Sequence, residues 1–304
     1  TAAYGVFHKV DEAKEFIAQT GAPIVVKADG LAAGKGVVVA MTIEEANAAV
    51  EDMLSGNRFG DAGSTVVIEE FMEGEEASLL AFVDGKTVVP MIASQDHKRI
   101  YDGDKGPNTG GMGTYAPAPV LTDALRDEAM KTILEPMVAA MEKEGMPYVG
   151  CLYAGLMITS QGPKVVEFNA RFGDPETQVV LPLLDSDLGQ IMMACATGTL
   201  TANMVKWKDS SAVCVILASK GYPETSSKGD VIHGDIKQHD TTIVFHSGTK
   251  LVGDEYVTNG GRVLGVVGLG KDLRTALDRA YGRIEHIDFE GMQYRTDIGA
   301  KAFK

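Results

Sequence analysis

A glycine-rich segment between two short apolar runs constrains this chain more than any other feature. Ile24–Val26 and Val37–Val39 are β-branched runs that predict two strands. The segment between them, Lys27–Gly36, carries glycines together with Lys27 and Lys35. Glycines let backbone N–H groups approach a phosphate and lysine adds positive charge, so the segment predicts a flap that closes over a triphosphate. A plain hairpin with surface lysines remains the alternative.

The spacing within this segment excludes the two common nucleotide-binding loops. Gly30–Gly36 is one residue shorter than a Walker A loop and lacks the Ser or Thr that holds magnesium there. It also lacks the Gly-x-Gly-x-x-Gly pattern of dinucleotide-binding folds. A nucleotide site at this segment therefore has to be of another type.

An α+β lobe is predicted around the two strands. Apolar side chains fall on one stripe of a helix over Val10–Thr20, and Gly21–Pro23 ends that helix. Thr42 and Glu45 are spaced as a capping box for a second helix. Its inward side is predicted to carry Ala46, Ala49, Val50 and Met53. We expect this lobe to end near Met72.

The rest of the chain is predicted to mix strands and helices, which makes the fold class α+β. The expected elements are a hairpin over 77–83 and 88–93, a long loop over 94–119, a helix over 122–143 kinked at Pro136, strands over 149–159 and 164–168, a helix from Asp174-Pro175 to about Thr197, a strand over 263–267 and a helix over 273–283. We predict a small lobe with the flap at 1–72, a large lobe with the metal and substrate site at 73–208, and a small strand-rich, mixed α/β domain at 209–304.

Composition and charge exclude several classes of partner. The net charge is -14 and no basic stripe is present, which argues against nucleic acid. No apolar run reaches the roughly 18 residues of a membrane span, and the N-terminus lacks a signal-peptide pattern, so no membrane partner is expected. The cysteines Cys151, Cys195 and Cys214 are far apart and odd in number, which is typical of a reduced, cytoplasmic compartment.

An acidic stretch, Val67–Glu76, links the first two predicted lobes. Small-molecule sites tend to form between lobes. Carboxylates there can accept hydrogen bonds from an adenine amino group and from ribose hydroxyls. A solvated acidic turn is the alternative.

Glu167 and Asn169 are two residues apart on a predicted strand, so their side chains project to one face. A carboxylate and an amide oxygen side by side suit Mg²⁺, which keeps waters and nucleotide phosphates as its other ligands. Arg171 can reach a transferring phosphoryl group, and Asp174 opens a predicted helix whose N-terminus favours anions. An exposed strand end followed by an Asn turn is the alternative.

A polar loop, Gln95–Arg99 continuing to Pro107–Gly113, is a candidate site for an acceptor substrate. Its glycines allow backbone amides to approach a ligand. His97 is either a general base or an ordinary loop histidine. The other histidines show no metal-ligand spacing, and no nucleophile is paired with a base, so covalent catalysis is not indicated.

Four ordered motifs together resemble the glycinamide ribonucleotide synthetase family, also called phosphoribosylamine-glycine ligases. They are VVKADGLAAGKGV, VVIEEFMEGEEASLLAFVDG, SQDHKRIYDGDKGPNTGGMGTYAP and VEFNARFGDPETQVVLPLL. The segments GRVLGVVGLG and YRTDIG are similar to the C-terminal domain of that family. The resemblance covers nearly the whole chain and implies an ATP-grasp fold, in which two α+β lobes hold ATP.

The resemblance also implies roles for individual residues. The implied ATP-binding residues are Lys27, Gly34, Lys35, Gly36, Glu69, Glu70, Phe71, Met72 and Glu76. The implied ligands of Mg²⁺ or Mn²⁺ are Glu167 and Asn169, and the implied catalytic residues are Arg171 and Lys35. The implied substrate-binding residues are Asp96, His97, Lys98, Gly110, Gly111, Met112, Arg171 and Asp174.

The activity implied by the resemblance joins glycine to phosphoribosylamine with ATP, through glycyl phosphate. Such chemistry needs positioning and electrostatics and no nucleophilic side chain. The rivals are another ATP-grasp ligase, similar to biotin carboxylase or to a formate-using purine enzyme, and a non-catalytic nucleotide-binding module.

The sequence departs from the family pattern in two places. Met146–Gln161 contains no Asp or Glu, which leaves no candidate there for a third metal ligand. Family members also carry an N-terminal α/β domain of about one hundred residues, the size of a typical domain, which contributes to the phosphoribosylamine site. The sequence opens on Thr1 without it, so we expect a fragment whose activity depends on that domain.

Overall fold

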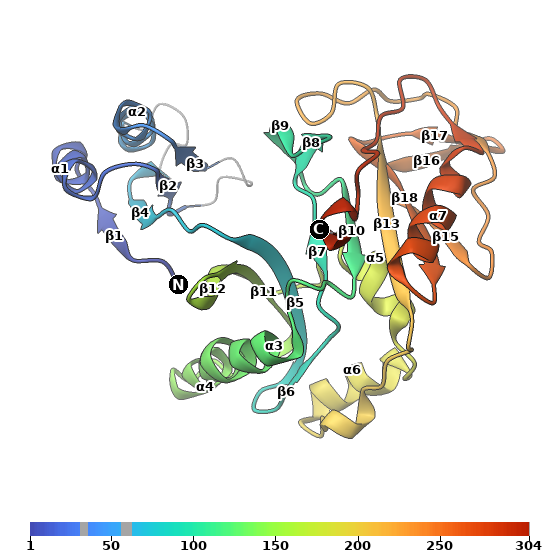
Figure 1. Ribbon diagram of the computed structural model, residues 1–304, viewed down its shortest axis with the longest axis horizontal. Coiled ribbons are helices and arrows are strands. Elements are labelled where there is room, and N and C mark those ends of the chain that lie inside the picture. The colour runs from blue at the N-terminus through green and yellow to red at the C-terminus, as the bar shows by residue number, and fades with distance from the viewer. Residues whose placement is uncertain (31–35, 56–62, 304) are drawn as a thin grey trace. The chain divides into compact units, whose positions relative to one another are not determined.

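The computed structural model describes residues 1–30, 36–55 and 63–303, and these form two compact units (Figure 1). Unit 1 is Thr1–Gly74 and unit 2 is Glu75–Lys304. The three predicted domain ranges, with boundaries after 72 and 208, stay predictions.

Unit 1 is a four-stranded antiparallel sheet covered on one face by two helices. The strand order is β1-β4-β2-β3. The elements are β1 (Tyr4–Phe7), α1 (Val10–Thr20), β2 (Ile24–Ala28), β3 (Val37–Ala40), α2 (Ile43–Leu54) and β4 (Val66–Glu70). Alternate strand residues such as Ile24, Val26 and Ile68 pack against the helices in one apolar core. The opposite face of the sheet carries the alternate side chains of the same strands.

Local signals fixed both helices of unit 1 as predicted. Gly21, at φ 86°, follows the last residue of α1, and its N–H donates to the Ile17 carbonyl. The Thr42 hydroxyl accepts from the Glu45 N–H at 3.2 Å, and Ala46, Ala49, Val50 and Met53 are buried. The Glu45 carboxylate accepts from the N–H of Met41 at 2.8 Å, so the capping box reaches back one residue further than the usual pattern.

Unit 2 begins with a sheet buried on both faces. Its strand order is β12-β11-β5-β6. The strands are β5 (Glu75–Asp84), β6 (Val88–Pro90), β11 (Val149–Thr159) and β12 (Gly162–Asn169). Along β5 the residues alternate, with Leu79 in one apolar cluster and Leu80 and Phe82 in another. Both predicted hairpins are confirmed, and the second one places Glu167 opposite Gly155 of β11.

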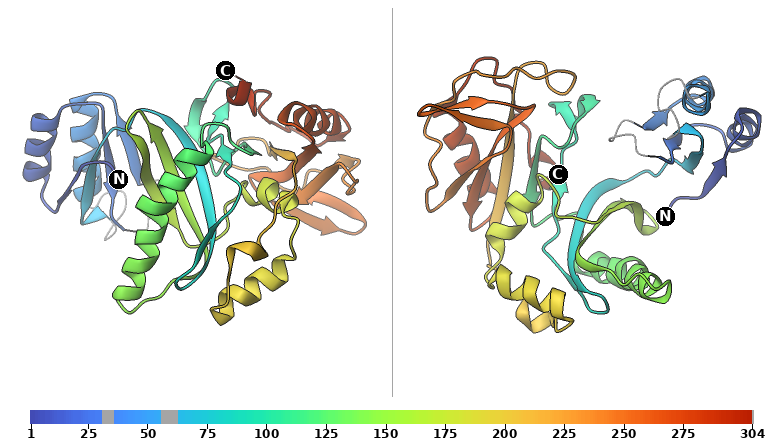
Figure 2. Two further views of the ribbon diagram at one scale, coloured as in Figure 1. Left: turned by 60° about the horizontal axis from the view of Figure 1, so that its bottom comes forward. Right: turned by 180° about the vertical axis from the view of Figure 1, so that it is seen from behind.

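The helix predicted over 122–143 forms with a break in its hydrogen-bonding pattern. It consists of α3 (Asp123–Ala129), a π-helical turn (Met130–Leu134) and α4 (Glu135–Lys143), which packs beside the sheet (Figure 2). Pro136 has no N–H to donate to the preceding turn, and the wider turn before it accommodates that loss.

The loop predicted over 94–119 is wrong, because this stretch contains short strands. These are β7 (Gln95–Asp96), β8 (Arg99–Tyr101), β9 (Lys105–Asn108) and β10 (Gly113–Ala116). β10 lies between β7 and β13 (Ser211–Ala218) in a second sheet of order β15-β18-β13-β10-β7. Its main partner is about a hundred residues away, and the local sequence is polar and rich in glycine, so no local pattern revealed it.

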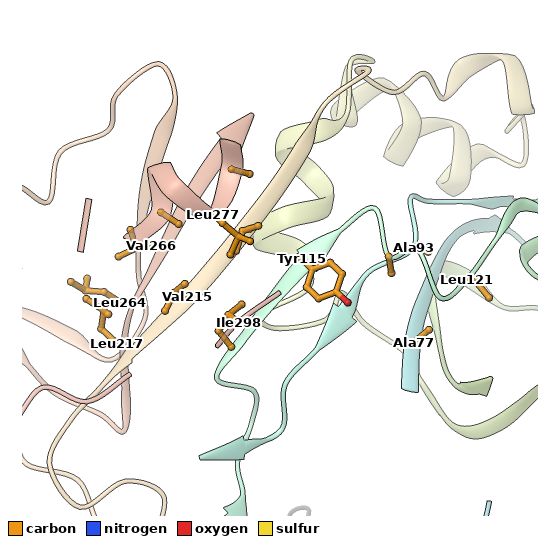
Figure 3. Close-up of a cluster of buried hydrophobic side chains, with 14 of the residues drawn as sticks. Ala77, Ala93, Tyr115, Leu121, Val215, Leu217, Leu264, Val266, Leu277 and Ile298 are labelled. Atoms are coloured by element: carbon orange, nitrogen blue, oxygen red, sulfur yellow. The ribbon is translucent and has the colours of Figure 1, made fainter. Parts of the chain in front are cut away.

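The C-terminal part of unit 2 completes the second sheet and covers it with a helix. Its elements are β14 (His233–Gly234), β15 (Thr242–His246), β16 (Thr249–Val252), β17 (Glu255–Thr258), β18 (Arg262–Gly270), α7 (Leu273–Ile284), β19 (Ile287–Asp288) and a 3₁₀ turn (Ala300–Phe303). A Cβ on Gly268 would clash with the α7 backbone at Ala276, so glycine permits the close packing of α7 on β18. Figure 3 shows part of the resulting core, where Val215, Val266 and Leu277 meet.

The helix predicted from Asp174-Pro175 to Thr197 is wrong as a single element. It is divided into α5 (Thr177–Val180), a 3₁₀ turn (Leu181–Leu183) and α6 (Leu188–Thr197), with a further 3₁₀ turn at Ala202–Met204. Between the pieces the chain pairs with a distant segment, since the N–H of Asp185 donates to the Lys206 carbonyl at 2.9 Å. No helix among the described residues is long and apolar enough to span a membrane.

Candidate active site

A small pocket in unit 2 is lined by charged side chains from three strands. Glu76 comes from β5, Asp96 from β7 and Glu167 from β12, and Lys98 follows β7. We term this the acidic pocket. Ser78 and Tyr153 contribute hydroxyl groups to its wall. From the sequence, the four charged residues were predicted to serve three separate functions, and the structure brings all four to one place.

Lys98 is the cation of the acidic pocket, and its ammonium pairs with the Glu76 carboxylate. Burial by itself would lower the pKa of Lys98. The carboxylates of Glu76, Asp96 and Glu167 outweigh that effect and raise the pKa above its usual value. Lys98 is therefore positively charged at neutral pH.

Asp96 lies where negative charge is unfavourable. Burial, and then the nearby carboxylate of Glu176, raise its pKa well above the usual range. Glu176 is itself buried, and its Oε1 accepts hydrogen bonds from the Tyr153 hydroxyl at 2.6 Å and from the Ser78 hydroxyl at 3.1 Å. A perturbed carboxyl group in a charged pocket is typical of functional sites. The sequence analysis missed Glu176 and Tyr153.

Glu167 and Asn169 project side by side from β12, as predicted from their spacing. The Asn169 Nδ2 donates to Glu167 Oε1 at 3.0 Å, and Glu167 is exposed to solvent. A half-turn of the Asn169 amide would place its oxygen beside the carboxylate, so the pair fits a hard cation that takes oxygen ligands. Within residues 1–30, 36–55 and 63–303, no group of three or more acidic, histidine or cysteine side chains is arranged to hold a metal ion.

Arg171 follows β12 and is exposed. Its Nη1 donates to the Phe172 carbonyl at 2.9 Å, and no carboxylate of the described residues pairs with it. An arginine without an acidic partner can bind an anionic group of a ligand.

The predicted backbone cradle at Gly110, Gly111 and Met112 differs from expectation, because protein atoms already accept from all three amides. The N–H of Gly110 donates to the Tyr222 hydroxyl at 3.0 Å, and that of Gly111 to the Thr109 hydroxyl at 3.0 Å. The N–H of Met112 donates to the His97 carbonyl at 2.8 Å, and the Met112 side chain is fully buried. The segment therefore shapes the site without offering free donors.

Gly111 has to be glycine for two reasons. Its φ is 113°, a conformation that side-chain-bearing residues rarely adopt. A Cβ at this position would also come within 2.8 Å of Asp96 Oδ1 and 2.5 Å of Pro175 Cδ. Gly111 thus lets the loop pack directly against the wall of the acidic pocket.

His97 occupies a structural position. Its side chain is buried, its Nδ1 lies 3.2 Å from the Gly113 carbonyl, and its Nε2 accepts from the Gly299 N–H at 3.4 Å. Burial, and then the positive charges of Arg295 and Lys301, lower the pKa of His97 to about 4. Of the two possibilities left open by the sequence, these contacts favour the ordinary structural histidine.

In unit 1, Lys27 and Glu69 form an ion pair on adjacent strands. Lys27 Nζ lies 2.6 Å from Glu69 Oε2, and both side chains are largely buried. The carbonyl of Gly36 accepts from the Ala28 N–H at 2.8 Å and closes the predicted hairpin. The predicted residues Gly34 and Lys35 lie outside the described residues.

The remaining predicted nucleotide residues surround the end of β4. Glu70 is the last residue of this strand, and its Oε2 accepts from the Ala3 N–H at 3.3 Å. Phe71 and Met72 lie in the coil that follows and are partly buried. Their roles toward adenine stay predictions.

Two arginines from the C-terminal part of unit 2 also pair with residues of other segments of the chain. Arg262 contacts Gly110 and Asp174, and the buried side chain of Arg295 pairs with Asp104 and Asp297. Neither arginine was predicted from the sequence. Apart from Asp297, the partners of both lie tens to almost two hundred residues away in the chain.

The three cysteines are free and buried, as their sequence context predicted. Burial raises the pKa of Cys151 to about 12, so its thiol is protonated and unreactive at neutral pH. The pKa values of Cys195 and Cys214 are raised for the same reason.

Family models match most of the chain. Residues 1–177 match the family described as phosphoribosylglycinamide synthetase, ATP-grasp (A) domain, and residues 212–301 match the C domain of the same synthetase. A relative named phosphoribosylamine–glycine ligase, from Caulobacter vibrioides, is 56% identical over 100% of this chain and 72% of its own length.

Solved structures give the same result. The crystal structure of phosphoribosylamine–glycine ligase from Thermotoga maritima has a TM-score of 0.88 and 36% identity, and covers 98% of this chain and 74% of its own. Biotin carboxylase from Campylobacter jejuni, with a TM-score of 0.75 over 97% of this chain and 64% of its own, is only 14% identical and shares the fold alone. The chain has an ATP-grasp fold, and it belongs to the phosphoribosylglycinamide synthetase family, the phosphoribosylamine–glycine ligases.

Proposed function

We propose that this chain catalyses the ATP-dependent joining of glycine to 5-phosphoribosylamine, which gives glycinamide ribonucleotide, ADP and phosphate. Family membership along nearly the whole chain supports the reaction. The structural observation that carries the proposal is the acidic pocket, where Glu76, Asp96, Lys98 and Glu167 converge. The function belongs to de novo purine synthesis and uses ATP as its cosubstrate.

The reaction takes two steps. A carboxylate oxygen of glycine attacks the γ-phosphorus of ATP, the bond from that phosphorus to the ADP oxygen breaks, and glycyl phosphate forms. The amine of phosphoribosylamine then attacks the carbonyl carbon, loses a proton, and displaces phosphate. Both steps depend on placing the reactants together and on stabilising charge.

The nucleotide is assigned to the residues that the sequence singled out. Lys27 and Lys35 bind phosphates together with the segment Gly34–Gly36, and the Glu69–Met72 stretch contacts adenine. Glu76 contacts ribose. Lys27 is held in place by its ion pair with Glu69, which supports a fixed position for its ammonium.

Glu167 and Asn169 are the residues of this chain that would hold Mg²⁺ or Mn²⁺. Such an ion, when bound, neutralises the charge of nucleotide phosphates. Arg171 stabilises the negative charge of the transferring phosphoryl group, which its lack of an acidic partner among the described residues supports. Asp96 and Lys98 orient the substrates in the acidic pocket.

The test is the substrate dependence of ADP formation by the intact enzyme. We expect ADP release only when glycine and phosphoribosylamine are both present with ATP and a divalent cation. ADP release driven by bicarbonate or formate would favour another ATP-grasp ligase. Nucleotide binding without turnover under every condition would favour a binding module.

A further inference from the structure

Arg262, at the start of β18, donates hydrogen bonds to two segments that carry predicted substrate residues. Its Nη1 donates to the Gly110 carbonyl at 2.7 Å and to the Asp174 carbonyl at 3.0 Å. The same nitrogen lies 3.2 Å from Asp174 Oδ1. One guanidinium therefore ties the Gly110 loop to Asp174 from a strand that follows Asp174 by 88 residues.

The fit around this guanidinium is close. A Cβ on Gly110 would lie 3.0 Å from Arg262 Cζ, so a larger residue there would push the guanidinium away from its present position. Gly110 is held from a second side, because its N–H donates to the Tyr222 hydroxyl at 3.0 Å. Arg262 and Tyr222 both belong to the C-terminal part of unit 2, so that part fixes the position of the loop.

The contacts on Asp174 leave one of its carboxylate oxygens available. Arg262 Nη1 and the Gln178 Nε2, at 2.9 Å, both approach Oδ1. Oδ2 has no hydrogen-bond partner among the described residues, and the side chain is 49% exposed. Asp174 is thus oriented by the protein at one oxygen and open to a ligand at the other.

Asp174 lies in the wall of a groove that also includes Thr177, Gln178 and His246. The Gln178 Oε1 is buried and has no hydrogen-bond partner among the described residues. The groove therefore presents the open Asp174 oxygen, and the unpaired Gln178 oxygen is buried behind its wall. An accessible carboxylate oxygen accepts hydrogen bonds from donor groups of a ligand. A substrate that carries amine and hydroxyl donors has the complementary chemistry.

We propose that Arg262 is a positioning residue of the ligase reaction. It orients Asp174 and the Gly110 loop so that the groove binds the amine and hydroxyl groups of a substrate. The inference rests on the proposed function, and it adds that the C-terminal part of unit 2 governs substrate affinity without touching the nucleotide. Both glycine and phosphoribosylamine carry an amine, and only phosphoribosylamine also carries hydroxyl donors.

The test is a steady-state comparison of Arg262→Ala, Arg262→Lys and Asp174→Asn in the intact enzyme. We expect Arg262→Ala to raise KM for phosphoribosylamine about 10- to 100-fold, because Asp174 and the Gly110 loop lose the group that orients them. KM for ATP should stay unchanged. Arg262→Lys should recover part of that affinity, because an ammonium can pair with Oδ1 but cannot reproduce the planar guanidinium. Asp174→Asn should raise the same KM.

Arg274→Ala is the matched control. Arg274 is in α7, stacks on the Phe303 ring at 4.2 Å, and is not among the residues that line the groove, so all three KM values should stay at the wild-type level. A rise in KM for glycine in place of phosphoribosylamine would assign the groove to glycine and overturn the hydroxyl part of the inference.

Three outcomes separate this inference from the proposed function. A wild-type enzyme that makes no ADP with glycine and phosphoribosylamine overturns the proposed function itself. A wild-type enzyme that turns over, with unchanged KM values in all three variants, overturns the inference alone. Equal loss of kcat with every KM unchanged, together with a lowered unfolding temperature, would show that Arg262 only stabilises the fold. If Arg262→Ala fails to fold, Asp174→Asn and Arg262→Lys decide the matter.

Discussion

Two clusters of charged side chains in unit 2 differ in how their charges balance. The acidic pocket has one cation, Lys98, near several carboxylates, and burial and Glu176 raise the pKa of Asp96. The second cluster, which we term the Arg295 clasp, joins Arg295 and Lys301 to Asp104 and Asp297. In the clasp the formal charges cancel, and in the acidic pocket they do not.

The geometry of the clasp is that of a structural ion-pair network. Arg295 is 1% exposed, and its Nε lies 2.7 Å from Asp297 Oδ1 while its Nη1 lies 2.9 Å from Asp104 Oδ1. The network attaches the β8–β9 hairpin to the end of the chain. A balanced network around one buried guanidinium stabilises the fold, whereas an excess of carboxylates leaves room for a cation or a substrate from outside.

The largest effect is expected from removing the Glu167 carboxylate of the acidic pocket. Glu167→Ala should lower kcat by about 10²- to 10³-fold, because it removes the carboxylate placed to hold the metal ion beside the reacting phosphoryl group. Steady-state ADP formation measures the loss. Glu144→Ala, at the exposed end of α4, is the control and should leave kcat unchanged. Wild-type activity in Glu167→Ala would remove this residue from the mechanism.

The next largest effect is expected on stability, from removing the central arginine of the Arg295 clasp. Arg295→Ala should lower the free energy of unfolding by about 2 kcal/mol, because it leaves two carboxylates without their buried partner. The partial exposure of both carboxylates keeps this loss below that of a fully buried pair. Urea unfolding measures this change. Arg126→Ala is the matched control, since Arg126 pairs with Asp123 and Asp127 on the exposed surface of α3 and should contribute about 0.5 kcal/mol or less. Equal losses in the two variants would contradict a special role for the clasp.

A smaller effect is expected from removing Lys98, and it distinguishes a cation that serves activity from Arg295, which serves stability. Lys98→Ala should lower kcat/KM by about 10-fold or more, the effect of losing one charged hydrogen-bond donor. Its effect on the unfolding free energy should stay below about 1 kcal/mol, because Lys98 and Glu76 are both partly exposed. Lys86→Ala, which breaks an exposed pair with Glu142 at 3.6 Å, should change neither quantity. A large loss of stability with normal activity would place Lys98 with Arg295.

The smallest effect appears in the pH dependence of stability. Burial opposes ionisation of Asp297, but the hydrogen bonds from Arg295 and from the Gly103 N–H outweigh it and lower its pKa to about 2. The folded protein thus binds this proton less tightly than the unfolded chain does. The stabilisation is complete above the ordinary aspartate pKa of about 4 and is lost as the pH falls toward 2.

Unfolding free energies measured between about pH 5 and pH 2 should therefore fall more steeply in the wild type than in Arg295→Ala. Other carboxylates titrate in both proteins, so the difference between the two curves isolates the clasp. Parallel curves would show that Arg295 does not control the pKa of Asp297.

The elements that the sequence predicted well are those held by nearby residues. α1 spans Val10–Thr20 as expected, because the apolar stripe and Gly21 lie within one short stretch. The β11–β12 hairpin formed as predicted, and it placed Glu167 beside Asn169 through the two-residue period of a strand. Thr42 capped α2 because its partner is three residues away.

The elements that the sequence did not predict depend on distant partners. β10 is a strand because Tyr115 pairs with Val213, and no local pattern in this polar, glycine-rich stretch indicates that pairing. The break between α5 and α6 combines a local cause, Pro182 in the 3₁₀ turn, with backbone pairing to Lys206 from farther along the chain. The predicted donors at Gly110 and Met112 were occupied for the same reason, since their acceptors lie elsewhere in the chain.

The sequence by itself determined the fold class, the family and the residue types available for chemistry, because ordered motifs and short-range periodicity are properties of the chain. Only the tertiary structure decided which of these residues share a pocket, and which charges are balanced. Arg262 and Arg295 illustrate the reason: the energy of a charged group depends on burial and on neighbours that come from other parts of the chain. These neighbours are present in the sequence, but only folding brings them into contact.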